Sequence, residues 1–157
     1  MPGNVKSVNM EDLSPLIEEL INSGTDIVLT VTGNSMFPIL KDKRDRVLLT
    51  KVDGSLKKYD IPLYIRDNGQ YVLHRIIKVK KDCYHLNGDN QTFVEKPIYH
   101  HQIKAVVKEI VRGGRVIRLQ HPWYLLYSRI WVWFFALRKP MITVYYKISR
   151  FLRRKRS

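Results

Sequence analysis

The spacing of apolar residues changes from a helical period to a strand period along the chain. Over residues 10–23, apolar residues recur three and four positions apart, as one face of a helix requires: Leu13, Leu16, Ile17, Leu20 and Ile21. Pro15 suits the first turn of a helix, and Gly24 follows the last residue of the pattern. We therefore predict a short amphipathic helix over residues 10–23.

From Ile27 onward, short runs rich in β-branched and aromatic residues replace the helical pattern. Pairs of turn-forming residues, such as Asn68-Gly69 and Gly113-Gly114, separate these runs. The alternation of strands with helices that a parallel sheet needs is missing. We predict a mostly β, antiparallel domain with strands in the runs 26–32, 45–52, 60–66, 70–79, 83–88, 105–112 and 115–119.

Charge divides the chain into two parts. The net charge is +14, yet residues 1–111 are almost balanced, with 16 Lys/Arg and 14 Asp/Glu. Residues 112–157 hold 12 Lys/Arg, no acidic residue and 10 of the 17 aromatic residues. We accordingly expect an N-terminal helical segment (1–25), a β-rich domain (26–120) and a basic, aromatic, helical tail (121–157).

The composition of the tail is typical of a helix that lies in the headgroup region of a membrane. Its apolar run, residues 123–137, is shorter than the ~18–20 residues needed to span a bilayer. Beyond Pro140, an apolar helical stripe continues with Lys and Arg beside it. We expect peripheral association with an anionic membrane surface through residues 122–157. A helical hairpin packed on the β domain accounts for the same pattern equally well.

Other partners and compartments follow from the same composition. The apolar surface of the tail exceeds what base stacking requires, so we expect no nucleic-acid partner. The N-terminus has acidic residues where a secretory signal needs an apolar core, which makes a cytoplasmic location our second expectation.

The single cysteine, Cys83, excludes an intramolecular disulfide. His100 and His101 have no carboxylate at ligand spacing, so we expect these histidines to be solvated and no metal to be bound. Nothing in the sequence implies an organic cofactor either.

The stretch VTGNSMFPIL (31–40) places a serine in a tight turn after a predicted strand. Gly33 and Pro38 exclude a helix interior or a central strand, so the Gly33-Asn34 turn should present Ser35. Met36 follows directly. Taken alone, this segment favours the plainer interpretation, an ordinary serine in a surface turn.

A nucleophilic serine needs a base, and His74 is the best candidate. Lys41 and Lys43 lie in a charged turn, where a lysine stays solvated and protonated. In a strand, His74 and Arg75 point to opposite faces, and a neutral imidazole is easier to bury than a guanidinium. If runs 70–79 and 83–88 form a hairpin, Asp89 returns toward His74. A hydrogen-bonded core histidine and a turn aspartate are the plainer alternatives.

Four ordered motifs carry a family resemblance over residues 26–111. These are GNSMFP (33–38), DIPLY (60–64), HRII (74–77) and GDN (88–90). Together they resemble the type I signal peptidases, which share a mostly β fold with the self-cleaving SOS repressors. The resemblance implies a signal-peptidase/SOS-repressor-like antiparallel β domain flanked by an N-terminal helix and a C-terminal helical tail.

The resemblance also implies roles for individual residues. Ser35 would be the nucleophile of a serine endopeptidase that cleaves signal or leader peptides. His74 stands where bacterial members mostly carry Lys and would be the general base. Asp89 would orient His74, as in the endoplasmic-reticulum and archaeal type. Gly33 and Asn34 would expose the Ser35 backbone N–H as an oxyanion donor, Met36 would line the cleft and Pro38 would fix the turn.

Two readings from other classes remain open. Family signal peptidases usually have an N-terminal transmembrane helix, whereas this sequence shows only SPLIEEL in that region. The chain could therefore be a non-enzymatic membrane-surface or interaction module in which Ser35 is only a turn residue. It could also be a self-cleaving regulator of the SOS-repressor type, although it shows neither a DNA-binding helix pair nor a Lys base.

Overall fold

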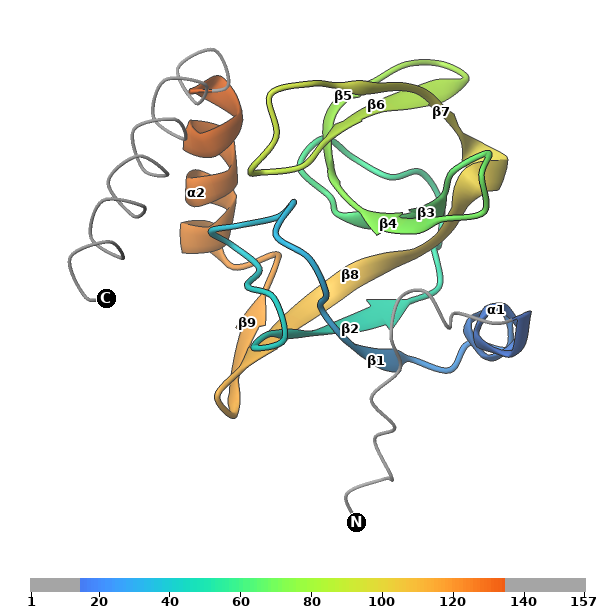
Figure 1. The fold of residues 1–157 in the computed structure, drawn as a ribbon, viewed down its shortest axis with the longest axis horizontal. Helices are drawn as coiled ribbons and strands as arrows, with labels where there is room; N and C mark the ends of the chain where they lie inside the picture. The colour runs from blue at the N-terminus through green and yellow to red at the C-terminus, as the bar shows by residue number, and fades with distance from the viewer. Residues whose placement is uncertain (1–14, 135–157) are drawn as a thin grey trace, which may run out of the picture.

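Nine β-strands and two α-helices form the part of the chain that the computed structural model describes, residues 15–134 (Figure 1). Helix α1 begins at Pro15 within the predicted range 10–23, of which residues 10–14 lie outside the described residues. The elements are α1 (Pro15–Asn22), β1 (Ile27–Thr30), β2 (Arg46–Thr50), β3 (Pro62–Ile65), β4 (Tyr71–Leu73), β5 (Arg75–Val79), β6 (Cys83–Asn87), β7 (Glu95–Tyr99), the 3₁₀ turn η2 (His100–Gln102), β8 (Ile103–Arg112), β9 (Arg115–Arg118) and α2 (Pro122–Trp133).

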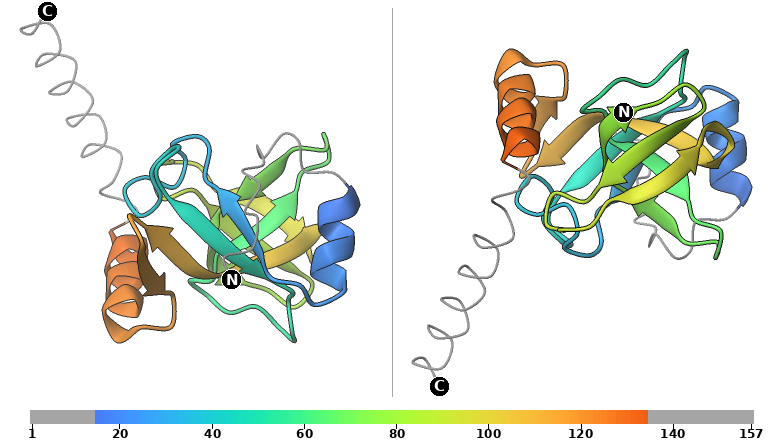
Figure 2. Two further views of the ribbon diagram at one scale, coloured as in Figure 1. Left: turned by 90° about the horizontal axis from the view of Figure 1, so that it is seen from below. Right: turned by 90° about the horizontal axis from the view of Figure 1, so that it is seen from above.

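All strand pairs are antiparallel and form two sheets, which confirms the predicted fold class. The larger sheet has the order β1-β2-β8-β3-β4, with β9 also paired to β8, and the smaller has the order β5-β6-β7. The long strand β8 organises the larger sheet, because β2 lies along one edge while β3 and β9 share the other. Figure 2 shows α1 and α2 at opposite ends of this β domain.

The chain passes from one sheet to the other at His74. This residue separates β4, an edge strand of the larger sheet, from β5 of the smaller one. Leu73 belongs to the core of the larger sheet and Ile76 to the core of the smaller. The sheet change therefore fixes His74 between two separately packed hydrophobic cores.

Among the described strands, β7 is the one that lies outside the predicted runs. Its sequence, EKPIY, contains Pro97, which normally argues against a strand. β7 pairs only with β6 and forms an edge of the smaller sheet, where a residue without a backbone N–H is tolerated.

Helix α2 is joined to the β domain by buried polar contacts. Tyr124 and Ser128 are buried and bond to Arg75, whereas Trp123 and Trp133 are exposed. The first part of the predicted tail is thus packed on the body through one face. Residues 135–157, which include the rest of that tail, lie outside the described residues.

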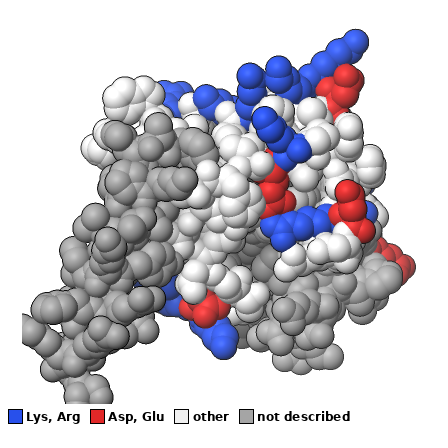
Figure 3. Space-filling model, turned by 45° about the horizontal axis from the view of Figure 1, so that its top comes forward, with Lys and Arg blue, Asp and Glu red and all other residues white. Residues whose placement is uncertain are grey.

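The surface shows how charge is distributed on the described part. On the face in Figure 3, Lys and Arg gather along the upper edge with acidic residues among them, and uncharged residues occupy much of the middle. Within residues 15–134, no helix is long and apolar enough to cross a bilayer.

Candidate active site

A cavity of about 680 Å³ brings together two of the motifs that are distant in sequence. Its walls come from residues 31–36, which follow β1, and from the β3–β4 hairpin with His74 at its end. Ser35 and His74 both line it, as do Gly33, Asn34 and Met36. Pro38 and Asp89 are not among its lining residues.

The loop that presents Ser35 is fixed at its base by a buried carboxylate. Asp45 is fully buried and accepts hydrogen bonds from the Lys41 backbone N–H, Arg44 and Arg112. Burial opposes ionisation of Asp45, but these hydrogen bonds outweigh it and hold its pKa well below the usual value. Arg112 also donates to the Ile39 carbonyl at 2.6 Å, so the ion pair ties the loop to β8.

The turn itself requires glycine. Gly33 has φ +84°, a left-handed conformation that side chains rarely adopt, and its N–H donates to Asp42 Oδ1 at 2.9 Å. Met36 is 3% exposed and belongs to the hydrophobic core, so it anchors the turn from within. The predicted presentation of Ser35 by a Gly-Asn turn is therefore what the structure contains.

The GDN motif holds the Ser35 backbone. The Asn90 N–H donates to the Ser35 carbonyl at 2.8 Å, and Asn90 Nδ2 donates to the Asn34 carbonyl at 3.1 Å. A Cβ on Gly88 would lie 2.7 Å from the Ser35 carbonyl oxygen, so only glycine fits there without displacement. The motif thus acts as a support for the serine loop.

Asp89 bonds to Arg75 and not to His74. Its Oδ1 and Oδ2 accept from Arg75 Nε at 2.9 Å and Arg75 NH2 at 2.7 Å. The expectation that Asp89 orients His74 is therefore wrong for this structure. The β5–β6 hairpin does return Asp89 to this end of the ribbon, but the residue that meets it there is Arg75, the first residue of β5, while His74 precedes the strand.

The expectation that His74 rather than Arg75 takes the protected position also needs correction, since both residues are 0% exposed. Burying a guanidinium is tolerated when its charge and N–H groups are paired. Arg75 NH1 donates to the Tyr59 carbonyl, Tyr124 Oη and Ser128 Oγ, in addition to the Asp89 pair. Burial works against the charged form, yet these partners raise the Arg75 pKa.

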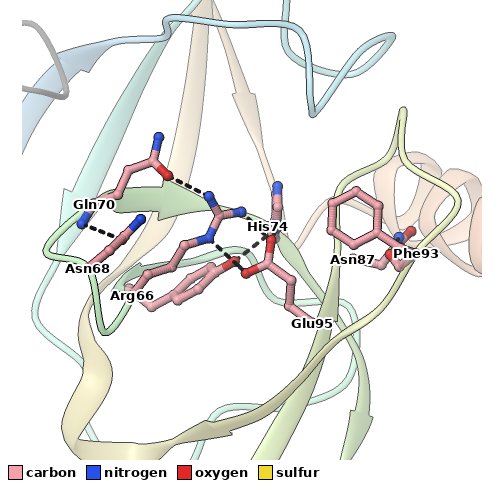
Figure 4. Close-up of polar contacts among 8 residues, drawn as sticks. Arg66, Asn68, Gln70, His74, Asn87, Phe93 and Glu95 are labelled. Atoms are coloured by element: carbon pink, nitrogen blue, oxygen red, sulfur yellow. Dashed lines mark hydrogen bonds and ion pairs between the residues drawn. The ribbon is translucent and has the colours of Figure 1, made fainter.

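The carboxylate beside His74 is Glu95, on the strand that the sequence pattern missed. Glu95 Oε1 lies 3.2 Å from His74 Nδ1, and Tyr64 Oη lies 2.9 Å from the same nitrogen. Tyr64 donates its proton to Glu95 Oε2 at 2.7 Å. Arg66 binds both carboxylate oxygens from the opposite side (Figure 4). These four residues form one connected network.

This network assigns the protons of His74. The only Tyr64 hydroxyl proton points to Glu95, so the Tyr64 oxygen and the carboxylate both face Nδ1 as acceptors. A neutral His74 consequently carries its proton on Nδ1 and its lone pair on Nε2. Burial favours the neutral Glu95 carboxyl, but bonds from His74, Arg66 and Tyr64 hold its pKa far below the usual value.

The second ring nitrogen of His74 is free to act. Nε2 is buried and has no hydrogen-bond partner among residues 15–134, and one ring nitrogen in Figure 4 points away from Glu95. Ser35 is therefore not bonded to His74 in this conformation, although both line the same cavity. Bonds of this kind often form only when substrate is present.

The described residues contain no cluster of side chains suited to binding a metal ion. Within residues 15–134, no group of three or more His, Cys, Asp and Glu side chains is arranged to hold a metal ion.

Comparison with known protein families identifies the family of this chain. The Peptidase S24-like family model matches residues 3–117, well over half of the 157 residues. This family covers the self-cleaving SOS repressors and the signal-peptidase-like serine peptidases, so the resemblance seen in the four motifs is confirmed at that level. No curated protein matches the chain. On the family match and the fold together, the chain belongs to the S24-like peptidase family.

Proposed function

We propose that this protein is a serine endopeptidase in which Ser35 is the nucleophile and His74 the general base, with Glu95 in place of Asp89 as the orienting carboxylate. One observation carries the proposal. His74 reaches the cavity of Ser35 with its Nδ1 held by Tyr64 and Glu95, and its Nε2 is left without a partner. That is the tautomer a base needs.

The proposed reaction follows the usual course of acyl transfer. Nε2 of His74 takes the Ser35 hydroxyl proton while Oγ attacks the scissile carbonyl carbon, and Glu95 stabilises the imidazolium that forms. The backbone N–H of Ser35, in the turn held by Asn90, is the proposed oxyanion donor. His74 then gives its proton to the leaving amine, and a water molecule hydrolyses the acyl-enzyme by the same steps.

The proposed substrate is a signal or leader peptide bound in an extended conformation. Strands β1 and β4 are the two ends of the larger sheet's strand order, and the cavity is lined by residues 31–33 after β1 and by Tyr71–Leu73 of β4. Edge strands present unpaired backbone groups that can bind an added strand. Small residues beside the cut are what the signal-peptidase resemblance implies.

The direct test is cleavage of a signal-type peptide that contains Ala-x-Ala, followed by mass spectrometry. The wild type should cut it, while Ser35→Ala and His74→Ala should not. Ser55→Ala, at an exposed serine that does not line the cavity, is the matched control and should retain activity. Cleavage that persists in Ser35→Ala refutes the proposal.

Self-cleavage is the second candidate, because the family includes self-cleaving repressors. Its test is the intact mass of the protein during long incubation. A Ser35-dependent loss of mass without cleavage of added peptides favours a self-cleaving regulator. If neither the peptide nor the chain is cut, and N-terminal profiling of a proteome shows no Ser35-dependent product, the non-enzymatic module is the better description.

A further inference from the structure

Helix α2 has two faces with opposite properties. Its inner face is bonded to the motifs of the candidate site: Tyr124 Oη and Ser128 Oγ accept from Arg75 at 3.1 and 2.9 Å. Trp131 Nε1 also donates to the Asp89 carbonyl at 3.1 Å. These contacts fix how α2 is rotated about its own axis and decide which residues face away from the body.

The outer face is a stripe of exposed, large apolar side chains. It consists of Trp123 (74% exposed), Leu126 (47%), Ile130 (47%) and Trp133 (79%). At about 100° per residue these positions fall within roughly 80° of one another, on the side opposite Tyr124 and Ser128. A soluble surface rarely gathers such residues without a partner.

Basic residues border this stripe. A groove of about 560 Å³ beside it is lined by Lys58, Tyr59, Arg129, Ile130, Val132 and Trp133. Arg129 is the only charged residue of α2, and residues 112–157 contain no acidic residue at all. Tryptophan at both ends of an apolar stripe, with cations beside it, is complementary to the boundary between acyl chains and anionic headgroups.

We propose that the outer face of α2 binds the surface of an anionic lipid bilayer, with the helix parallel to the membrane plane and Trp123 and Trp133 inserted at headgroup depth. Lys58 and Arg129 contact lipid phosphates. Because the inner face of α2 is bonded to Arg75 and Asp89, this contact also sets the orientation of the Ser35 cavity relative to the bilayer. The proposal stands independently of peptidase activity.

The test is co-sedimentation of the full chain with phosphatidylcholine vesicles that do or do not contain phosphatidylglycerol. The wild type should bind the anionic vesicles, with the Trp fluorescence maximum shifted to the blue. Trp123→Gln/Trp133→Gln should bind at least about tenfold more weakly, since much of the inserted apolar area is lost. The matched control, Val79→Gln/Tyr99→Gln, removes exposed residues at the last positions of β5 and β7, which do not line the groove beside α2, and should bind like wild type.

Three results would overturn the proposal. Failure of the wild type to bind anionic vesicles excludes the membrane as the partner. If the Trp123→Gln/Trp133→Gln variant still binds the vesicles and high salt abolishes this binding, the membrane contact is made by basic residues elsewhere in the chain. A dimer of the wild type in sedimentation velocity that becomes monomeric in the Trp variant, without vesicle binding, makes the stripe an interface between two copies.

Discussion

Replacing Glu95 by Gln tests whether this carboxylate keeps the His74 proton on Nδ1. Each oxygen of the Glu95 carboxylate accepts two hydrogen bonds. Oε2 accepts from Tyr64 and Arg66, and Oε1 accepts from His74 and Arg66. A glutamine puts an NH₂ group in one of these places. If the NH₂ group replaces Oε2, it donates to the Tyr64 oxygen, so the Tyr64 proton turns toward His74 Nδ1. If the NH₂ group replaces Oε1, it points its own protons at His74 Nδ1. Either arrangement favours the proton on Nε2.

The size of the effect follows from the distance. Two unit charges 3.2 Å apart attract by about 5 kcal/mol at an effective dielectric constant of ~20. Arg66 pairs with the same carboxylate and cancels part of this attraction, and a hydrogen bond to a charged group contributes about 1.5–3 kcal/mol. A loss of about 2–4 kcal/mol for the imidazolium state corresponds to roughly 30- to 1,000-fold in kcat/KM.

The assay needs no known substrate, because ¹⁵N chemical shifts of a histidine ring report its tautomer directly. Long-range ¹H–¹⁵N NMR of the wild type should show the His74 proton on Nδ1, with His74→Gln identifying the signals. Glu95→Gln should move the population toward the Nε2–H form. Glu109→Gln, which removes a carboxylate paired with Arg118 on the β8–β9 hairpin, is the matched control and should leave His74 unchanged.

A folded Glu95→Gln protein with the Nδ1–H tautomer intact would refute the reasoning, as would unchanged peptide cleavage by that variant. Asp89→Asn separates the two carboxylates. If Asp89 were the orienting group after all, its substitution would alter the His74 ring signals, whereas the Arg75 contact predicts a loss of stability with the tautomer unchanged.

Three further outcomes test the supports of the site. Gly88→Ala should displace the Ser35 carbonyl, since the new Cβ would lie 2.7 Å from it, and should cost about 1–3 kcal/mol in urea unfolding together with activity. Arg75→Met leaves the Asp89 charge buried, so the unfolding free energy should fall by about 3–5 kcal/mol, and a neutral result would contradict the buried ion pair. The Glu95 pKa is lower in the folded than in the unfolded chain, so its stabilisation is present above the usual value of 4.5 and is lost as pH falls below it. Thermal melts should therefore show a shallower acid decline for Glu95→Gln than for wild type between about pH 4.5 and 2.

Local patterns in the sequence determined the fold class and the two groups proposed for the chemistry. Alternating apolar runs and glycine turns predicted the antiparallel β domain, and the Gly33-Asn34 turn predicted that Ser35 is presented at its edge. The predicted single strand over 70–79 was wrong in one respect, because the structure divides it at His74 into β4 and β5 of different sheets. Pro97 concealed β7, since the exception for edge strands depends on a neighbour that the local pattern does not show.

Only the tertiary structure decided that Glu95 pairs with His74 and Asp89 with Arg75. The sequence places Asp89 in a motif and Glu95 in an apparent loop, yet the β6–β7 pairing carries Glu95 to His74 while Arg75 takes Asp89. Which carboxylate reaches which partner depends on how strands of the two sheets are placed against each other, and no local sequence pattern encodes that placement. The same holds for α2: its composition suited both a packed helix and a membrane helix, and the buried bonds of Tyr124 and Ser128 to Arg75 assign its inner face to the body. Burial of a guanidinium is favourable only when partners from distant segments surround it, and such partners exist only once the chain has folded.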